Sequence, residues 1–239
     1  MGGSIQGKAL PLSQSVTTFV GSSSGSDGTG TAARFINPGG ITTDGTNLYI
    51  TDKDNTIRKM VIASGEVTTL AGTPGVYGSA DGTGATASFY FPTGIVNNGT
   101  NLYVADSQNG TIRKIEIATG IVTTIAGNPL LHGGSFDGTG TTATFNQPAE
   151  MTTDGTNLYV RERGNTRKVV IATGVVTTLS SNSFMYGGGI TTDGTTLYVA
   201  DAPAIRKLNI ATGIITTQST NPIAVNPSGM ARRCFKWVA

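Results

Sequence analysis

The chain of 239 residues contains one cysteine, Cys234, one histidine, His132, and one tryptophan. A single cysteine excludes disulfides within the chain and cysteine-rich zinc sites, and a single histidine cannot supply a zinc centre held by several histidines. No apolar run approaches the roughly 18 residues of a membrane-spanning helix. Charged residues make up 13% of the chain, and the formal net charge is +2. Because this balance creates no strong field, we expect neither a nucleic-acid partner nor membrane insertion.

The chain is rich in glycine, with 34 residues, and in threonine. This composition suits short strands joined by tight turns and argues against a helical solenoid. A surface rich in threonine, glycine and serine but poor in lysine and glutamate is typical of secreted bacterial proteins. We therefore favour an extracellular or cell-surface location, although residues 1–8 lack the apolar core of a signal peptide.

A strand motif containing Leu-Tyr recurs four times, centred on Tyr49, Tyr103, Tyr159 and Tyr198, with spacings of 54, 56 and 39 residues. Each copy is followed within a few residues by an Arg-Lys strand, at Arg58, Arg113, Arg167 and Arg206. Self-similarity at such a period indicates a repeat architecture. The repeat units span about 21–71, 72–126, 127–180 and 181–220.

Each unit contains four short segments with the composition of strands, separated by turn residues. In the first unit, an Asp44-Gly45 turn separates Ile41–Thr43 from the Leu-Tyr strand, and a Val-Thr-Thr strand closes the unit. Glycine tolerates the positive φ that such hairpin turns need. Four antiparallel strands per unit are typical of a propeller blade, so we predict an all-β propeller.

The motifs resemble those of the NHL-repeat family of β-propellers. The resemblance rests on Pro92-Thr93-Gly94-Ile95, on the Asp-Gly-Thr-Asn-Leu-Tyr core and on Asn109 to Lys114, and it covers roughly residues 16–220. It implies about six blades, whereas this chain has four full repeats and the start of a fifth at Asn226–Met230. We therefore expect four blades that close on themselves, end blades that self-associate, or part of a truncated six-bladed ring.

The two ends of the chain depart from the repeat. Residues 1–15 are expected to form a loose leader, and residues 16–20 resemble the last strand of a unit. Residues 221–239 begin a fifth repeat and then continue into an aberrant tail.

Each unit pairs an acid with the arginine of the next strand, and we interpret these as structural ion pairs that fix the intervening turn. The pairs are Asp52 with Arg58, Asp106 with Arg113, Glu162 with Arg167, and Asp201 with Arg206. A residue present in every blade usually serves the blade itself.

Three inserted Asp-Gly-Thr-Gly loops, at Asp27, Asp81 and Asp137, are weak calcium candidates. Calcium requires six to eight oxygen ligands, and each loop offers a single carboxylate. An Asx-turn followed by glycine accounts for the same residues. We expect no cofactor, with calcium as the alternative.

The third unit breaks the repeat. Glu150 occupies a glycine position, Arg161 replaces a small residue, Arg163 follows Glu162 in a shortened turn, and His132 lies in the preceding loop. We expect these residues to lie on one face of the propeller as candidate ligand contacts. On this basis, alanine at Arg161 and Arg163 would weaken binding with little effect on melting.

These features favour a non-catalytic scaffold that binds a protein or carbohydrate partner through its loop face. Six-bladed relatives of the NHL propellers include lyases and lactonases that hold a metal in the central channel. The first alternative is therefore an enzyme of that type with a metal held by carboxylates. The second is a fragment of a larger repeat protein without independent function.

Overall fold

The computed structural model describes residues 25–181, 188–201 and 204–220. The predicted leader, the strand at 16–20 and the tail from residue 221 lie outside the described residues. Within the described part, the protein is almost entirely β, with four antiparallel sheets and four single-turn 3-10 helices. None of the helices found there is long and apolar enough to cross a membrane. The predicted all-β propeller is confirmed.

Each repeat forms one blade. Blade 1 contains β1 (Gly28–Thr29), β2 (Pro38–Thr43), β3 (Asn47–Asp52), β4 (Thr56–Val61) and β5 (Glu66–Ala71). Blade 2 contains β6 (Gly82–Thr83), β7 (Pro92–Asn97), β8 (Asn101–Asp106), β9 (Thr111–Glu116) and β10 (Ile121–Ala126). Blade 3 contains β11 (Gly138–Thr139), β12 (Met151–Thr153), β13 (Asn157–Arg161), β14 (Asn165–Val170) and β15 (Val175–Ser181). Blade 4 contains β16 (Ile190–Thr192), β17 (Thr196–Asp201), β18 (Ala204–Asn209) and β19 (Ile215–Thr220).

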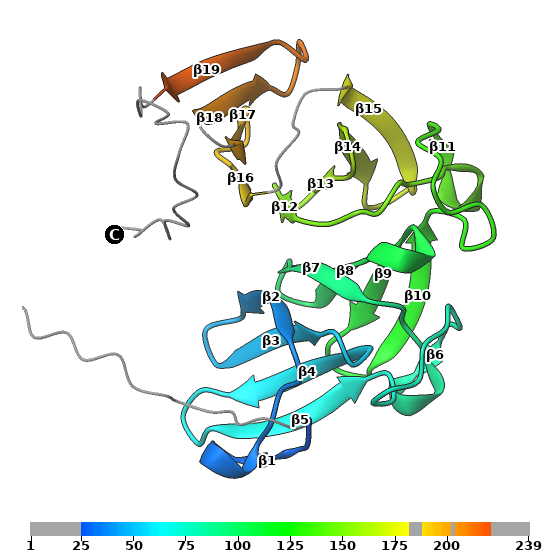
Figure 1. Ribbon diagram of the computed structural model, residues 1–239, viewed down its shortest axis with the longest axis vertical. Helices are drawn as coiled ribbons and strands as arrows, with labels where there is room; N and C mark the ends of the chain where they lie inside the picture. The colour runs from blue at the N-terminus through cyan, green and yellow to red at the C-terminus, as the bar shows by residue number, and fades with distance from the viewer. Residues whose placement is uncertain (1–24, 182–187, 202–203, 221–239) are drawn as a thin grey trace, which may run out of the picture.

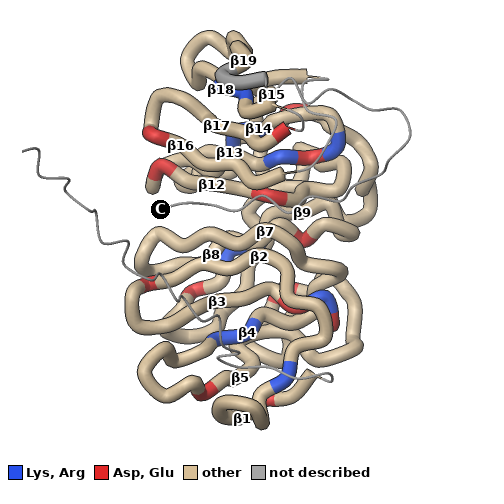
Figure 2. The backbone as a smooth tube through the Cα atoms, turned by 60° about the vertical axis from the view of Figure 1, so that its left-hand side comes forward, with Lys and Arg blue, Asp and Glu red and all other residues tan. Residues whose placement is uncertain are grey.

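The blades follow one another along an arc, with blades 1 and 4 at its two ends (Figure 1). The strands β2, β7, β12 and β16 lie on the inner side of the arc, and β5, β10, β15 and β19 lie on the outer side. Acidic and basic residues are interspersed through all four blades (Figure 2).

The first three blades have a fifth strand that the sequence did not predict. Gly28 and Thr29 of β1 pair antiparallel with Val67 and Glu66 of β5, and β6 and β11 pair in the same way with β10 and β15. A 3-10 turn follows each of these strands: η1 (Gly30–Ala32), η2 (Gly84–Thr86) and η4 (Gly140–Thr142). The inserted Asp-Gly-Thr-Gly segment is therefore the outermost strand of its blade.

The Asp-Gly turns have the expected chemistry. Asp44 Oδ1 accepts hydrogen bonds from the backbone N–H groups of Thr46 (2.8 Å) and Asn47 (2.6 Å), and Gly45 has a φ of 88°. An L-residue with a side chain is strained at this φ, so glycine is the residue that permits the turn. The phenol of Tyr49 donates to Asp44 Oδ2 at 2.9 Å and joins the turn to the following strand.

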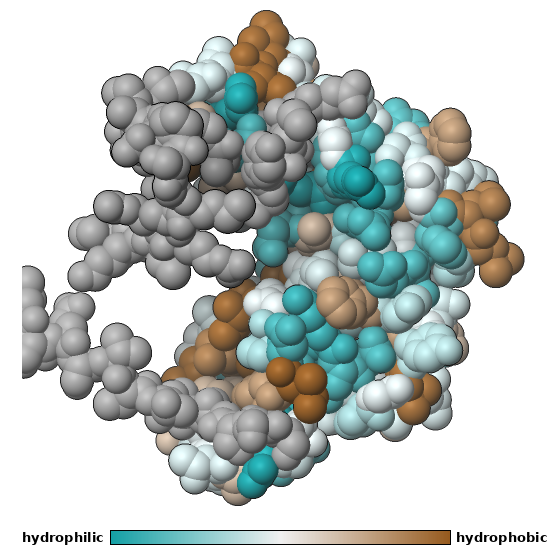
Figure 3. Space-filling model, viewed as in Figure 1, coloured by the Kyte–Doolittle hydropathy of each residue, from teal (hydrophilic) through white to brown (hydrophobic). Residues whose placement is uncertain are grey.

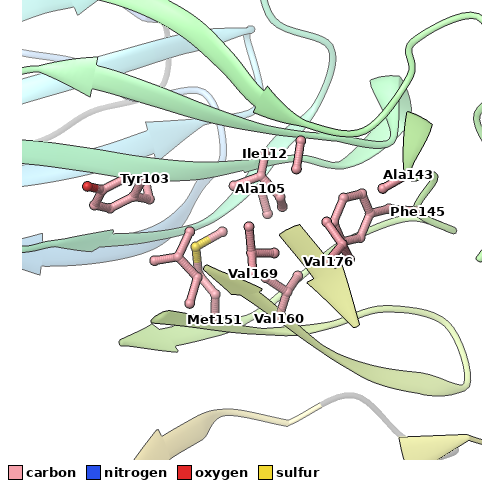
Figure 4. Close-up of a cluster of buried hydrophobic side chains, with 11 residues drawn as sticks. Tyr103, Ala105, Ile112, Ala143, Phe145, Met151, Val160, Val169 and Val176 are labelled. Carbon is pink, nitrogen blue, oxygen red and sulfur yellow. The ribbon is translucent and has the colours of Figure 1, made fainter. Parts of the chain in front are cut away.

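The hydrophobic core consists of separate clusters between neighbouring blades. Between blades 2 and 3, Tyr103 and Ile112 pack against Leu158 and Val169, all of them buried (Figure 4). A similar cluster joins blades 1 and 2, where Tyr49 and Ile57 meet side chains of the next blade. Blades 2 and 3 thus each present one face to the blade before them and one face to the blade after them.

The inner strands approach one another through glycines. A Cβ atom on Gly40 would lie 2.5 Å from the Thr93 carbonyl oxygen, and one on Gly94 would lie 2.2 Å from that of Ala149. Gly94 N–H donates to Ala149 O at 3.0 Å, and the hydroxyl of Thr51 donates to Thr93 O at 2.6 Å. These backbone contacts and the Thr51 hydroxyl hold the first three blades together at their inner edge.

Candidate functional site

A buried arginine lies inside each of the first three blades. Arg58 is 1% exposed; its Nη2 lies 2.7 Å from Asp27 Oδ1, its Nη1 donates to Arg34 O at 3.0 Å, and its guanidinium lies over the ring of Phe35 at 5.1 Å. Arg113 stacks on Phe89 and Arg167 stacks on Phe145 in the same way. Each guanidinium therefore joins the inserted loop to the strands of its blade.

In all four blades, the acid predicted to pair with the arginine of the Arg-Lys strand lies within ion-pair distance of it. The nitrogen-to-oxygen distances are 3.8 Å for Asp52–Arg58, 2.9 Å for Asp106–Arg113, 2.9 Å for Glu162–Arg167 and 2.7 Å for Asp201–Arg206. The acids also hold backbone, because Asp52 accepts from the N–H groups of Ile36 (2.9 Å) and Asn37 (2.7 Å). These contacts account for the recurrence of the pairs in structural terms.

Asp27, Asp81 and Asp137 each bind the buried arginine of their own blade, at 2.7, 2.8 and 2.8 Å. Burial alone would raise the pKa of Asp27, but hydrogen bonds from Thr69 and from Arg58 outweigh it and leave the pKa below its ordinary value. Among the described residues, no group of three or more histidine, cysteine, aspartate or glutamate side chains is placed to hold a metal ion. Calcium binding at these aspartates stays a prediction.

Arg161 crosses from blade 3 to blade 4. Its side chain is 5% exposed, and its Nη1 donates to the carbonyl of Gly188. Desolvation lowers the pKa of Arg161, whereas the charges of Asp201 and Glu150 oppose this shift. Glu150 is exposed. Partial desolvation raises the pKa of its carboxyl group, and the nearby positive charge of Arg161 lowers it by a smaller amount, so the pKa lies above its ordinary value. The Arg161 side chain therefore bridges blades 3 and 4. At the two earlier junctions, the inner strands meet instead through Gly40 and Gly94.

The other candidate ligand contacts differ in accessibility. Glu162 is 4% exposed and accepts from Asn146 N–H at 2.8 Å as well as from Arg167, so its carboxylate is engaged within its blade. Arg163 and His132 are exposed. His132 lies beside Gly110, where an added Cβ would be 3.2 Å from the His132 Cβ. The structure therefore leaves Arg163, His132 and Glu150 accessible and buries Arg161 and Glu162.

Sequence reasoning missed an aromatic cluster beside the blade 1–2 connection. Tyr77 is 69% exposed, and its ring lies 5.1 Å from that of Tyr90 at an interplanar angle of 33°. Next to Tyr90, the Lys53 ammonium lies 4.9 Å from the centroid of the Phe91 ring. We call Tyr77, Tyr90 and Phe91 the aromatic cluster. The only signal in the sequence is that Tyr90 and Phe91 precede Pro92, at a position where the first repeat has Ile36 and Asn37.

Tyr77 of the aromatic cluster stands on a loop that hydrogen bonds fix in place. Gly75 N–H donates to Asp54 O at 2.8 Å, Gly78 N–H donates to Phe89 O at 3.0 Å, and the side-chain amide of Asn109 donates to Gly78 O at 2.7 Å. Phe91 N–H donates to Asn55 Oδ1 at 2.9 Å. We call the loop 73–80, the turns 53–55 and 107–109 that hold it, and residues 90–91 the loop face.

Phe91 has a φ of 57°, in the left-handed region that a bulky residue rarely adopts. Such backbone strain persists only where the surrounding structure enforces it, and it is often found at binding sites. Here the bond to Asn55 holds the backbone of Phe91, whose side chain remains 38% exposed.

The next connection, 128–136, carries a second group of exposed apolar side chains. Leu130 is 88% exposed, Leu131 61% and Phe136 70%. Hydrophobic surface is visible over the loop between β10 and β11 (Figure 3). The two long connections between blades therefore both expose apolar residues.

No family model matches the sequence. Over 92 residues the chain is 36% identical to NHL repeat-containing protein 2 of Gallus gallus, a match covering 38% of this chain and 12% of that protein. The chain thus corresponds to a small part of that relative. A solved structure of a protein of unknown function from Bacteroides thetaiotaomicron VPI-5482 superimposes with a TM-score of 0.56 at 23% identity, covering 71% of this chain and 46% of the other. The four blades form a β-propeller, and the repeated motifs and the partial sequence match are similar to those of NHL-repeat proteins.

Proposed function

We propose that this propeller is a non-catalytic interaction scaffold that binds a protein or polysaccharide partner through its loop face. The observation that carries the proposal is the aromatic cluster, in which exposed Tyr77 stands on a loop held by hydrogen bonds to two turns and exposed Tyr90 and Phe91 stand directly before β7. Tyrosine supplies a large amphipathic contact area at low cost in conformational entropy, and binding residues are often found on loops positioned by a rigid scaffold.

The chemistry of the cluster supports a partner of low charge. Tyr77 and Tyr90 add hydroxyl groups to flat apolar surface, and Lys53 is the cation next to Phe91. Neutral sugar rings and extended peptide segments can both stack on such a surface. The exposed Arg163 and His132 belong to the following blade and its connection, and they extend the candidate contact area with polar groups.

The proposal can be tested with two defined sets of probes. The purified chain is run in native gels containing neutral polysaccharides, and in parallel it is panned against a displayed peptide library. Any probe that binds is then titrated against the Tyr77→Ala/Tyr90→Ala double variant. The matched control is Ile214→Ala, which changes an exposed apolar residue in blade 4 that is 62% accessible.

We expect the double variant to weaken binding by tenfold or more, since truncating a central aromatic contact typically costs at least 1–2 kcal/mol, and the control to bind like the wild type. Equal binding by the double variant and the wild type, with an unchanged melting temperature, would remove the aromatic cluster from the binding site. Failure of both sets of probes to bind the wild type would contradict the proposed partner classes.

A further inference from the structure

The two end blades carry the two halves of the interface that joins neighbouring blades within the chain. At the junctions between blades 1 and 2 and between blades 2 and 3, the earlier blade supplies the tyrosine of the Leu-Tyr strand and an isoleucine from the Arg-Lys strand, such as Tyr49 and Ile57 of blade 1. The following blade supplies the inner-strand residue Ile95 together with Leu102 and others. Blade 4 has the first kind of face available, and blade 1 has the second.

Exposure at equivalent positions shows which faces have no neighbouring blade among residues 25–181, 188–201 and 204–220. The inner-strand residue is 5% exposed in blade 2 (Ile95) and 6% in blade 3 (Met151), but 60% in blade 1 (Ile41). At the other end, Ile57 and Ile112 are fully buried, whereas Ile205 of blade 4 is 38% exposed. Both differences lie at positions that a neighbouring blade covers elsewhere in the chain.

The glycines of the inner strands give the same result. An added Cβ on Gly40 or Gly94 would collide with the backbone of the next blade, whereas one on Gly189, at the same position of blade 4, meets no atom within 4 Å. Blade 4 therefore repeats the glycine of this backbone contact, with no backbone of the described residues opposite it. By the repeat register, the segment that fits there corresponds to Gly39–Ile41 of blade 1.

We propose that blade 4 of one chain packs on blade 1 of a second copy of this chain, in the register of the internal blade junctions. This junction places Ile205 and Gly189 of one copy against the inner strand of the other, beside Ile41. It is a head-to-tail contact, since two different surfaces meet. Two such junctions would close eight blades into one ring, within the range of four to eight that propellers commonly have.

A mixing experiment tests this junction on the full chain. Ile41→Asp blocks the blade 1 surface and Ile205→Asp blocks the blade 4 surface. Each variant alone keeps one usable surface and has nothing to pair it with, so each is expected to be monomeric in light scattering on a sizing column. Mixed in equal amounts, the two retain one complete junction and should form a 1:1 complex of twice the chain mass of 24.5 kDa.

The restored complex also shows that both variants fold. The matched control is Ile214→Asp, because the equivalent Ile121 is 41% exposed in a blade with neighbours on both sides. This control should associate like the wild type, which we expect to exceed the mass of a monomer. A wild-type chain that stays monomeric at high micromolar concentration would overturn the proposal, as would association that survives either single variant or a mixture that stays monomeric.

Discussion

Arg58 and Asp27 stand 31 residues apart in the sequence, and Arg58 Nη2 lies 2.7 Å from Asp27 Oδ1. The same contact joins Arg113 to Asp81 and Arg167 to Asp137, each at 2.8 Å. In blade 4, Arg206 pairs with Asp201 at 2.7 Å and its side chain is 36% exposed. The inserted loops therefore carry the carboxylate that encloses the arginine of their own blade.

Replacing Arg58 with alanine should destabilise the fold by about 3–5 kcal/mol, because it leaves the buried Asp52 without its cation and empties a site stacked on Phe35. Arg206→Ala is the matched control, since a half-exposed ion pair contributes about 1 kcal/mol or less. Urea unfolding followed by circular dichroism measures both. Equal losses for the two variants would contradict the structural account of the enclosed arginines.

Gly94→Ala should force blades 2 and 3 apart, because the new Cβ would lie 2.2 Å from the Ala149 carbonyl oxygen. Overpacking of this kind costs about 1–3 kcal/mol. Gly189→Ala places the same methyl group where no atom lies within 4 Å, so in dilute protein it should change stability little. Thermal melting at low concentration distinguishes the two, and a tolerated Gly94→Ala would show that the inner strands can separate without cost.

Arg161→Ala should lower stability by about 2 kcal/mol, since it removes a buried, charged hydrogen-bond donor to Gly188. Arg163→Ala, in an exposed turn, should leave the melting temperature unchanged. Loosening of blade 4 can be followed by hydrogen exchange of β17 and β18, which should accelerate in Arg161→Ala only. Unchanged exchange in these strands would show that Arg161 does not hold blade 4.

The pH dependence of stability should reflect the Asp-Gly turn. The hydrogen bond from the Asn47 side chain is the largest of the contacts that lower the pKa of Asp44. Burial and the hydrogen bond to Asp44 raise the pKa of Tyr49 to about 12. The contribution of Asp44 is therefore complete above pH of about 4 and lost as pH falls through its lowered pKa. The contribution of Tyr49 to stability is complete below a pH of about 10 and is lost as the pH rises towards about 12.

Two variants separate these limbs in pH-dependent urea unfolding. Asp44→Asn should flatten the acidic limb relative to the wild type, and Tyr49→Phe should flatten the alkaline limb. Tyr77→Phe, in an exposed loop, is the control. Identical pH profiles for wild type and Asp44→Asn would show that the turn carboxylate does not contribute to the pH dependence.

The blades could be predicted from the sequence because their signals are local and repeated. The Asp44-Gly45 turn and the Leu-Tyr strand that follows it specify a hairpin without reference to the rest of the chain. The pairing of Asp27 with Arg58 could not be predicted, since it depends on how an inserted loop folds back across the sheet. For the same reason the sequence suggested calcium for an aspartate whose described partners are an arginine and a threonine.

The candidate contact residues were harder to predict. The departure of Arg161 from the repeat predicts a ligand contact, but in the structure this side chain joins blade 3 to blade 4. The contact between Tyr77 and Tyr90 could not be predicted, because it depends on the path of the 73–80 loop. Neither the repeat period nor the turn residues specify that path. Repeats thus predict the frame well and say little about the loops that distinguish one propeller from another.

The pairing of β1 with β5 joins the first and last strands of one repeat. A sheet arranged in this way is complete only when the final strand of the repeat has been synthesised. The entropy cost of closing the intervening chain is then met in one step, when the first and last strands pair. Each of the first three repeats should therefore gain or lose its structure as one cooperative unit. In blade 4, whose described sheet begins at β16, the outer strand can detach by itself, so unfolding should start at that end of the arc.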